Sequence, residues 1–125
     1  MMICLDANVA LEVVLKRLRY KACEQFLDTS EEEKALSTLT LDLVMFFAEK
    51  NKAGLKPIKA FLDGFTWLPI TEADAHWAFA HYQEKDFEDG LQVACALREG
   101  CDTFVTLDGG LAKKYADKIQ IELIR

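Results

Sequence analysis

The sequence lacks the residue patterns that build structural zinc sites. Its four cysteines include no C-x-x-C pair, and its two histidines, His76 and His81, lie one turn plus one residue apart in a single expected helix. Neither arrangement suits tetrahedral zinc ligation. The cysteines are therefore expected to be reduced thiols, as in cytosolic proteins. The sequence also contains no repeat and no low-complexity stretch.

An excess of basic residues is missing as well. The chain has 21 acidic and 15 basic residues, with a net charge of −6 and a pI near 4.9, which argues against coating nucleic acid through net charge. The start, Met1 to Asp6, has no basic region and reaches a charge after a short apolar run, so we expect no signal peptide and no membrane span. These features predict a soluble, cytoplasmic protein. With 125 residues that are 51% hydrophobic, residues 1–125 are expected to form one domain.

Short apolar runs alternate with helical patterns along the chain. Strands are expected at residues 2–6, 35–37, 65–70, 103–107 and 119–124, and helices after residue 6 and at 20–30, 38–50, 57–62, 71–82, 86–99 and 110–115. Thr38 or Thr40 is expected to cap the third helix, and Pro69 to lie at a sheet edge or strand end. Strands separated by helices pair in parallel, so the order predicts a three-layer α/β fold with a central, mainly parallel sheet flanked by helices.

Three aspartates stand at the mouths of these segments. Asp6 closes the first strand, Asp89 lies in the first turn of the helix that starts near Asp86, and Asp108 closes the strand at 103–107. Open α/β sheets build their sites at the carboxyl ends of the strands, where these side chains would converge. Clustered carboxylates repel one another unless a cation or a proton joins them. The sequence therefore predicts a divalent-metal site.

Each aspartate also has a plain structural interpretation. Asp6 and Asp86 are suited to cap the helices that follow them, and Asp108 before two glycines is a typical turn residue. If Asp86 caps its helix, Asp89 projects from the first turn. The joint occurrence of the three after strand-like segments favours the site.

Three stretches read together carry a resemblance to a known family. They are Leu5-Asp6-Ala7-Asn8-Val9 near the start, Asp86-Phe87-Glu88-Asp89-Gly90-Leu91-Gln92 before an Ala-rich helix, and Val105-Thr106-Leu107-Asp108 near the end. In this order and spacing they resemble the PIN domain, a family of small nucleases that includes the toxins of VapC-type toxin–antitoxin pairs.

The resemblance implies a metal-dependent ribonuclease that hydrolyses RNA phosphodiester bonds with Mg²⁺ or Mn²⁺. It assigns Asp6, Asp89 and Asp108 as catalytic metal ligands, with Asp86 as a further metal-binding group. Asn8 and Thr106 match polar positions that lie beside the acidic positions in the family, so they are expected to support the metal ligands. It also implies an antitoxin protein as inhibitor and a homodimer, for which the aromatic residues around 43–47 and 77–82 are candidate surfaces.

One expected carboxylate is displaced. The family's second acidic position is a glutamate on the helix after a Ser-x-x-Thr-Leu stretch, and here Leu43 occupies it, with Asp42 one position earlier. One position is a rotation of about 100° on a helix. The alternative function is therefore a catalytically impaired PIN-like module that binds RNA or regulates. A response-regulator receiver domain would need an acidic pair after the first strand, where this chain has only Asp6.

Overall fold

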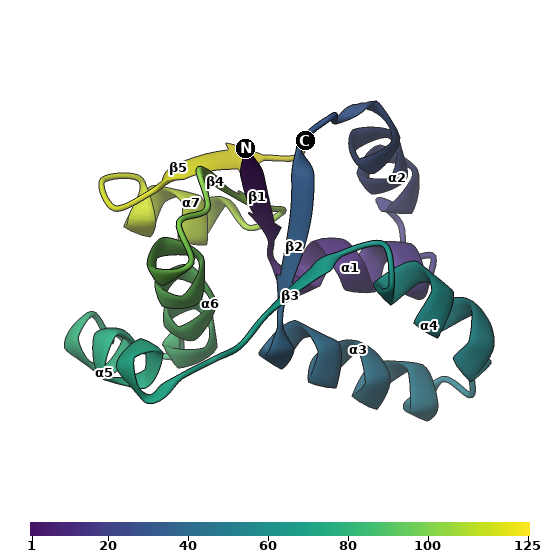
Figure 1. Cartoon of the computed structure of the whole chain (residues 1–125), viewed down its shortest axis with the longest axis horizontal. Helices are drawn as coiled ribbons and strands as arrows, with labels where there is room; N and C mark the ends of the chain where they lie inside the picture. Colours follow the sequence, from purple (N-terminus) through teal and green to yellow (C-terminus); the bar gives the residue numbers. More distant parts are fainter.

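Strands and helices alternate along the whole chain, residues 1–125, in a computed structural model (Figure 1). The strands are β1 (Met2–Leu5), β2 (Glu33–Ser37), β3 (Thr66–Leu68), β4 (Thr103–Thr106) and β5 (Gln120–Leu123). The helices are α1 (Ala7–Val14), α2 (Tyr20–Thr29), α3 (Thr38–Lys50), α4 (Leu55–Leu62), α5 (Glu72–Ala80), α6 (Phe87–Arg98) and α7 (Gly109–Tyr115). The sheet order is β3-β2-β1-β4-β5 and every pair is parallel, which confirms the predicted α/β class.

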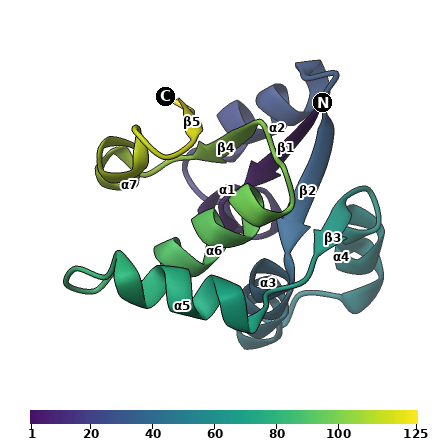
Figure 2. The same cartoon turned by 60° about the vertical axis from the view of Figure 1, so that its left-hand side comes forward.

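The sheet is buried on both faces. Along β1, Ile3 and Leu5 point into one hydrophobic cluster, while Cys4 between them points into the other, because successive side chains of a strand face opposite sides. Helices α1 to α4 cover the first face and α6 and α7 the second, with α5 packed outside α6 (Figures 1 and 2). Two-sided burial explains why the middle strand β1 is a continuous apolar run, whereas the edge strands β3 and β5 carry exposed polar residues.

Several boundaries differ from those expected from the sequence. The cap of α3 is Ser37, whose Oγ accepts a hydrogen bond from the Thr40 N–H at 3.2 Å, rather than Thr38 or Thr40. Strand β3 ends before Pro69, and β3 is an edge strand, so both placements of that proline are confirmed. Helix α5 ends at Ala80 instead of continuing to residue 82.

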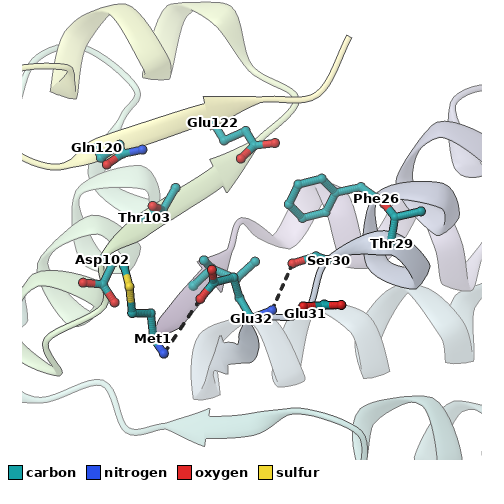
Figure 3. A pocket seen from close by; sticks show the side chains of 11 residues that line it. Met1, Phe26, Thr29, Ser30, Glu31, Glu32, Asp102, Thr103, Gln120 and Glu122 are labelled. Carbon is teal, nitrogen blue, oxygen red and sulfur yellow. Dashed lines mark hydrogen bonds and ion pairs between the residues drawn. The ribbon is translucent and has the colours of Figure 1, made fainter.

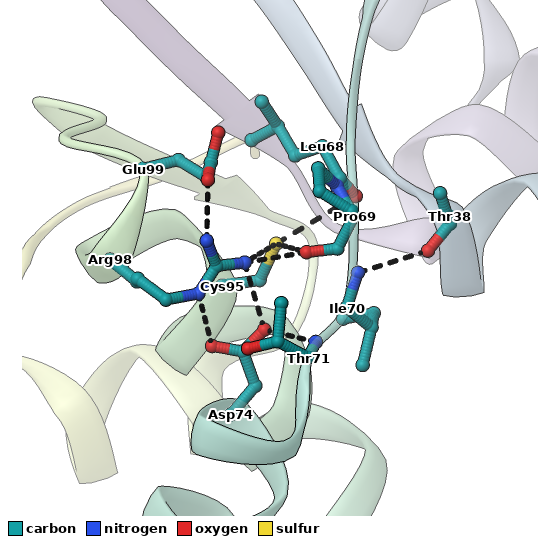
Figure 4. A network of polar contacts seen from close by, with 9 residues as sticks. All are labelled: Thr38, Leu68, Pro69, Ile70, Thr71, Asp74, Cys95, Arg98 and Glu99. Carbon is teal, nitrogen blue, oxygen red and sulfur yellow. Dashed lines mark hydrogen bonds and ion pairs between the residues drawn. The ribbon is translucent and has the colours of Figure 1, made fainter.

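A charged network fixes α6 against α5 (Figure 4). The guanidinium of Arg98 forms two hydrogen bonds to the buried carboxylate of Asp74, at 2.9 and 3.0 Å, and a third to the carbonyl of Pro69. Asp74 also accepts a hydrogen bond from the backbone N–H of Thr71 at 2.9 Å, which caps α5 as the Thr-x-x-Asp pattern indicates.

The two helices also approach each other closely at Gly90 of α6. A Cβ added at this glycine would lie 3.1 Å from the Cβ of Ala78 on α5. Helix α6, which carries Asp89, is thus held in a defined position.

No helix combines the length and the apolar composition that crossing a bilayer requires.

Candidate active site

The sheet has a topological switch point between β1 and β4. From β1 the chain proceeds outward through β2 and β3 on one side, and later through β4 and β5 on the other. At such a point the loops after two neighbouring strands diverge and leave a crevice at their carboxyl ends. Asp6 follows β1 and Thr106 ends β4, so both lie at this crevice.

The Asp6 carboxylate is buried and held from both of its oxygens. Thr106 Oγ1 donates to Oδ2 at 2.7 Å, and Gln92 Nε2 donates to Oδ1 at 3.3 Å. Asp6 stands at the N-cap position of α1, but its side chain makes no capping hydrogen bond, and the N–H of Ala7 donates to Gln92 Oε1. Burial raises the pKa of Asp6, and the Thr106 hydroxyl partly opposes that rise. The side chain therefore serves the crevice more than the helix.

Thr106 joins Asp6 to Asp108. Its hydroxyl oxygen accepts hydrogen bonds from Asn8 Nδ2 at 3.3 Å and from the Asp108 N–H at 3.0 Å, while its own proton goes to Asp6. Asn8 Oδ1 in turn accepts the N–H of Leu107 at 3.3 Å. The two supporting residues named from the sequence thus contact each other and the segment leading to Asp108.

Asp108 does what its turn position indicates and keeps one oxygen free. Its Oδ1 accepts the N–H groups of Gly110 at 2.8 Å and Leu111 at 3.2 Å, which caps α7. No hydrogen bond engages Oδ2 on this exposed residue. One oxygen is structural, and the other is available to a ligand.

Asp89 is the carboxylate of this cluster whose negative charge is not balanced by a hydrogen-bond donor or a cation. Burial, followed by the charges of Asp6, Asp108 and Glu88, raises its pKa from 3.8 to about 7, and neither a hydrogen bond nor a cation opposes the rise. A half-buried carboxylate beside like charges prefers a proton unless a cation replaces it. Asp6, Asp89 and Asp108 therefore share one electrostatic neighbourhood.

Asp86 is held apart by a cation of the protein itself. It forms an ion pair with Lys114 of α7, with both side chains more than four-fifths buried, and it accepts the N–H of Gln83 at 2.9 Å. Although Asp86 occupies the N-cap position of α6, its side chain makes no capping hydrogen bond. The pair joins the start of α6 to α7. A role for Asp86 as a metal ligand stays a prediction.

The second acidic position has no carboxylate turned toward the cluster. Asp42 is exposed on α3 and contributes to the pKa of neither Asp6 nor Asp89. Leu43 lies three residues after Thr40, hence on the same helix face, and Thr40 contacts the site through Gln92. The extra negative charge near Asp6 and Asp89 comes instead from Glu88, which the sequence interpretation did not assign.

Gln92 and Thr40 are two further residues in contact with this site that the sequence interpretation did not assign to it. Gln92 is fully buried, and its Oε1 accepts hydrogen bonds from Thr40 Oγ1 at 3.1 Å and from the Ala7 N–H at 3.2 Å. A signal for it exists in the sequence, because Gln92 follows Asp89 by three positions on the same helix face and is polar within an apolar run.

The donor set fits a hard cation that keeps part of its water shell. Asp6, Asp89 and Asp108 offer carboxylate oxygens, the ligands that Mg²⁺ and Mn²⁺ prefer. No three Asp, Glu, His or Cys side chains are placed so that they alone could hold a metal ion. Mg²⁺ typically takes one or two carboxylates and completes its shell with water and substrate phosphate. The uncompensated Asp89 beside Asp6 matches that smaller requirement.

The largest hollow of the molecule, about 580 Å³, lies at the opposite, amino edge of the sheet (Figure 3). Its rim carries the acidic side chains of Glu31, Glu32, Asp102 and Glu122. None of these four carboxylates contributes to the raised pKa of Asp6 or Asp89. This hollow is therefore separate from the crevice.

Comparison with known proteins identifies the family. The model of the PIN domain matches residues 3–117. The chain belongs to the PIN domain family. The predicted resemblance is thereby confirmed, and the switch-point crevice lies within the matched PIN region. No curated protein sequence is a significant match.

Solved structures agree with the PIN fold. The chain is similar to a protein in a toxin–antitoxin complex from Klebsiella pneumoniae, with 20% identity, a TM-score of 0.78 and 98% of each chain covered. It is also similar to VapC20 of Mycobacterium tuberculosis, a sarcin-ricin loop cleaving toxin, with 13% identity, a TM-score of 0.72 and 89% of this chain and 93% of the other covered. A third neighbour is FitAcB from Neisseria gonorrhoeae, with 23% identity, a TM-score of 0.67 and 96% of each chain covered. At these identities the likeness establishes the fold.

Proposed function

We propose that this PIN domain is a metal-dependent ribonuclease that hydrolyses RNA phosphodiester bonds. The observation that carries the proposal is the partial burial of Asp89 beside Asp6 and Asp108 without any compensating cation, which raises its pKa to about 7. Such an arrangement costs folding free energy in the free protein. A bound divalent ion removes the cost and supplies a chemical function at a crevice suited to a ligand.

The residues divide the work according to their contacts. Asp6 and Asp89 would hold the ion, and Asp108 would reach it through a water molecule from Oδ2, the oxygen that does not cap α7. Thr106 and Asn8 hold Asp6 and the segment leading to Asp108 in fixed relative positions through hydrogen bonds. A Mg²⁺ or Mn²⁺ ion bound there would lower the pKa of a water molecule and neutralise the phosphate oxygens. No nucleophilic side chain is required.

A second candidate function follows from Leu43. With no carboxylate on that face of α3, the domain would bind a metal ion and RNA without turnover, as a regulatory module. The two candidates differ in a single measurable property, which is cleavage at saturating metal concentration.

The test is cleavage of fluorescently end-labelled RNA with and without about 1 mM Mn²⁺, a concentration in the range in which weak oxygen sites fill. We expect cleavage that stops with a chelator and falls at least about 100-fold in Asp6→Asn and Asp89→Asn, because each removes a charged ligand. Asp28→Asn, an exposed aspartate on α2, is the matched control. Cleavage that needs no metal ion and survives both site variants would refute metal-dependent catalysis at this site. Mn²⁺ binding without cleavage would favour the regulatory module.

We further propose that the protein acts in the cytoplasm as the toxin of a toxin–antitoxin pair. The Klebsiella pneumoniae neighbour comes from a toxin–antitoxin complex, which supports an antitoxin partner. Three exposed aromatic side chains support a homodimer: Phe46 on α3, Phe79 on α5 and Tyr82 just after α5. Growth arrest on expression that depends on Asp6 would support the toxin, and unimpaired growth alongside RNA cleavage in vitro would indicate a stand-alone nuclease.

A further inference from the structure

A single buried amide connects four parts of the site. The side chain of Gln92 is completely enclosed, with 0% of its surface exposed, and all its hydrogen bonds are made inside the protein. Its Nε2 donates to Asp6 Oδ1 at 3.3 Å, and its Oε1 accepts from Thr40 Oγ1 at 3.1 Å and from the Ala7 N–H at 3.2 Å. Gln92 of α6 thus joins the end of β1 to the first turns of α1 and α3.

The partners permit only one orientation of this amide. The Ala7 N–H can only donate, so it requires the oxygen end of the Gln92 side chain, and the ionised carboxylate of Asp6 can only accept, so it requires the nitrogen end. A rotated amide would place Oε1 against the carboxylate and Nε2 against the N–H, losing both hydrogen bonds in a buried place. The direction of the donor toward Asp6 is therefore fixed by the backbone of α1.

The same amide limits the directions from which a further ligand can approach the two carboxylate oxygens of Asp6. Thr106 holds Oδ2 from the β4 side, and Gln92 holds Oδ1 from the α6 and α3 side. A carboxylate has about four lone-pair sites, so each oxygen keeps one for a further ligand in a defined direction. Without Gln92, only the Thr106 hydroxyl would hold the carboxylate, and the direction of Oδ1 would no longer be fixed.

We propose that Gln92 is the positioning residue of the metal site: it sets the orientation in which Asp6 binds the ion. This inference rests on the proposed function for the identity of the ligand, a divalent cation. Partners that orient metal ligands typically change metal affinity or activity by about 10- to 100-fold when they are removed. Because Gln92 is enclosed, it touches no RNA, so its effect falls on the ion and on kcat rather than on KM for RNA.

The test compares Gln92→Met, which keeps the approximate volume but not the amide, with the exposed control Gln25→Leu on α2. Mn²⁺ affinity is measured by isothermal titration calorimetry, and kcat and KM by RNA cleavage. We expect Gln92→Met to weaken Mn²⁺ binding about 10- to 100-fold and to lower kcat at fixed Mn²⁺, with KM for RNA changed less than about twofold. The control should match the wild-type protein in all three quantities.

Thr40→Val is the second variant, in case Gln92→Met fails to fold. It removes one donor to Gln92 Oε1 but leaves the contact between Gln92 and Asp6, so it should weaken Mn²⁺ binding by a smaller factor, about two- to tenfold. Circular dichroism confirms that each variant is folded. Unchanged Mn²⁺ affinity in a folded Gln92→Met protein, or in Thr40→Val if only that variant folds, would overturn the proposal.

The outcomes separate this inference from the nuclease itself. A wild-type protein that binds Mn²⁺ but cleaves no RNA contradicts the nuclease, while the affinities still decide the role of Gln92. A protein that cleaves RNA and tolerates Gln92→Met contradicts only the positioning role. A wild-type protein that binds no Mn²⁺ overturns both.

Discussion

In the metal-free protein, replacing Asp89 by asparagine is expected to stabilise the fold at alkaline pH. Asp89 has a pKa of about 7 in the folded protein and an ordinary value of 3.8. Above pH 7 the side chain is ionised in both states, and the folded state then bears the cost of a half-buried charge beside Asp6 and Asp108. Asparagine removes that charge while keeping the shape of the side chain.

The size of the effect follows from the pKa difference. At about 1.4 kcal/mol per pH unit, a fully enclosed carboxyl with pKa values of 3.8 and about 7 would cost about 4 kcal/mol when ionised. Asp89 is only half-buried, and solvent screens its neighbours, so we expect about 1–2 kcal/mol. The sign is opposite to that of a salt-bridged aspartate: the folded state binds the extra proton, and stability falls as the pH rises from 3.8 to 7.

Urea denaturation with a chelator present, at about pH 5 and pH 8, measures this difference. Asp89→Asn should exceed the wild-type stability at pH 8 and exceed it by less at pH 5, whereas Asp28→Asn should show no such pH dependence. With Mn²⁺ at 100 times its Kd, the wild-type protein gains about 2.7 kcal/mol and the order reverses. A variant that is no more stable than the wild type at pH 8 without metal would refute this account of Asp89.

Three further changes probe other parts of the molecule. Arg98→Met should lower stability by about 3–5 kcal/mol, because it leaves the carboxylate of Asp74 buried without its cation, and thermal denaturation against an Arg98→Lys control checks this. Lys114→Met should lower stability by about 1–3 kcal/mol, because it leaves the mostly buried Asp86 carboxylate without its cation, and urea denaturation measures this. Leu43→Glu should tighten Mn²⁺ binding at least about threefold in calorimetry by adding a carboxylate ligand, and weaker binding would show that this face of α3 points away from the ion.

The sheet and its principal carboxylates were predictable from local patterns. An apolar run ending in Asp6 and another ending before Asp108 read as strands, and parallel pairing brings the carboxyl ends of such strands to one edge regardless of their separation along the chain. Asp89 then follows from its place in the first turn of an amphipathic helix.

Contacts between elements were not predictable in the same way. The interpretation of Asp86 as a helix cap depended on its local sequence, but Lys114, from a later helix, takes the carboxylate. Periodicity likewise marks the buried face of α6 without showing that its polar residue, Gln92, would find partners on α1 and α3. Such pairings depend on how helices pack across the sheet, which the spacing of apolar residues leaves open.

One proton links the stability of the free protein to its affinity for metal. At the proposed metal site a cation and a proton would compete for Asp89, so Mn²⁺ binding would release the proton that the folded protein holds below its pKa of about 7. The apparent affinity should therefore rise by up to about tenfold per pH unit between pH 5.5 and 7 and level off above, over the range in which the metal-free protein loses stability. Calorimetric titration with Mn²⁺ in buffers of different ionisation enthalpy measures both the affinity and the proton released. Equal affinities at pH 5.5 and 8 would mean that the ion does not replace the proton of Asp89, and that the carboxylate cluster balances its charge in another way.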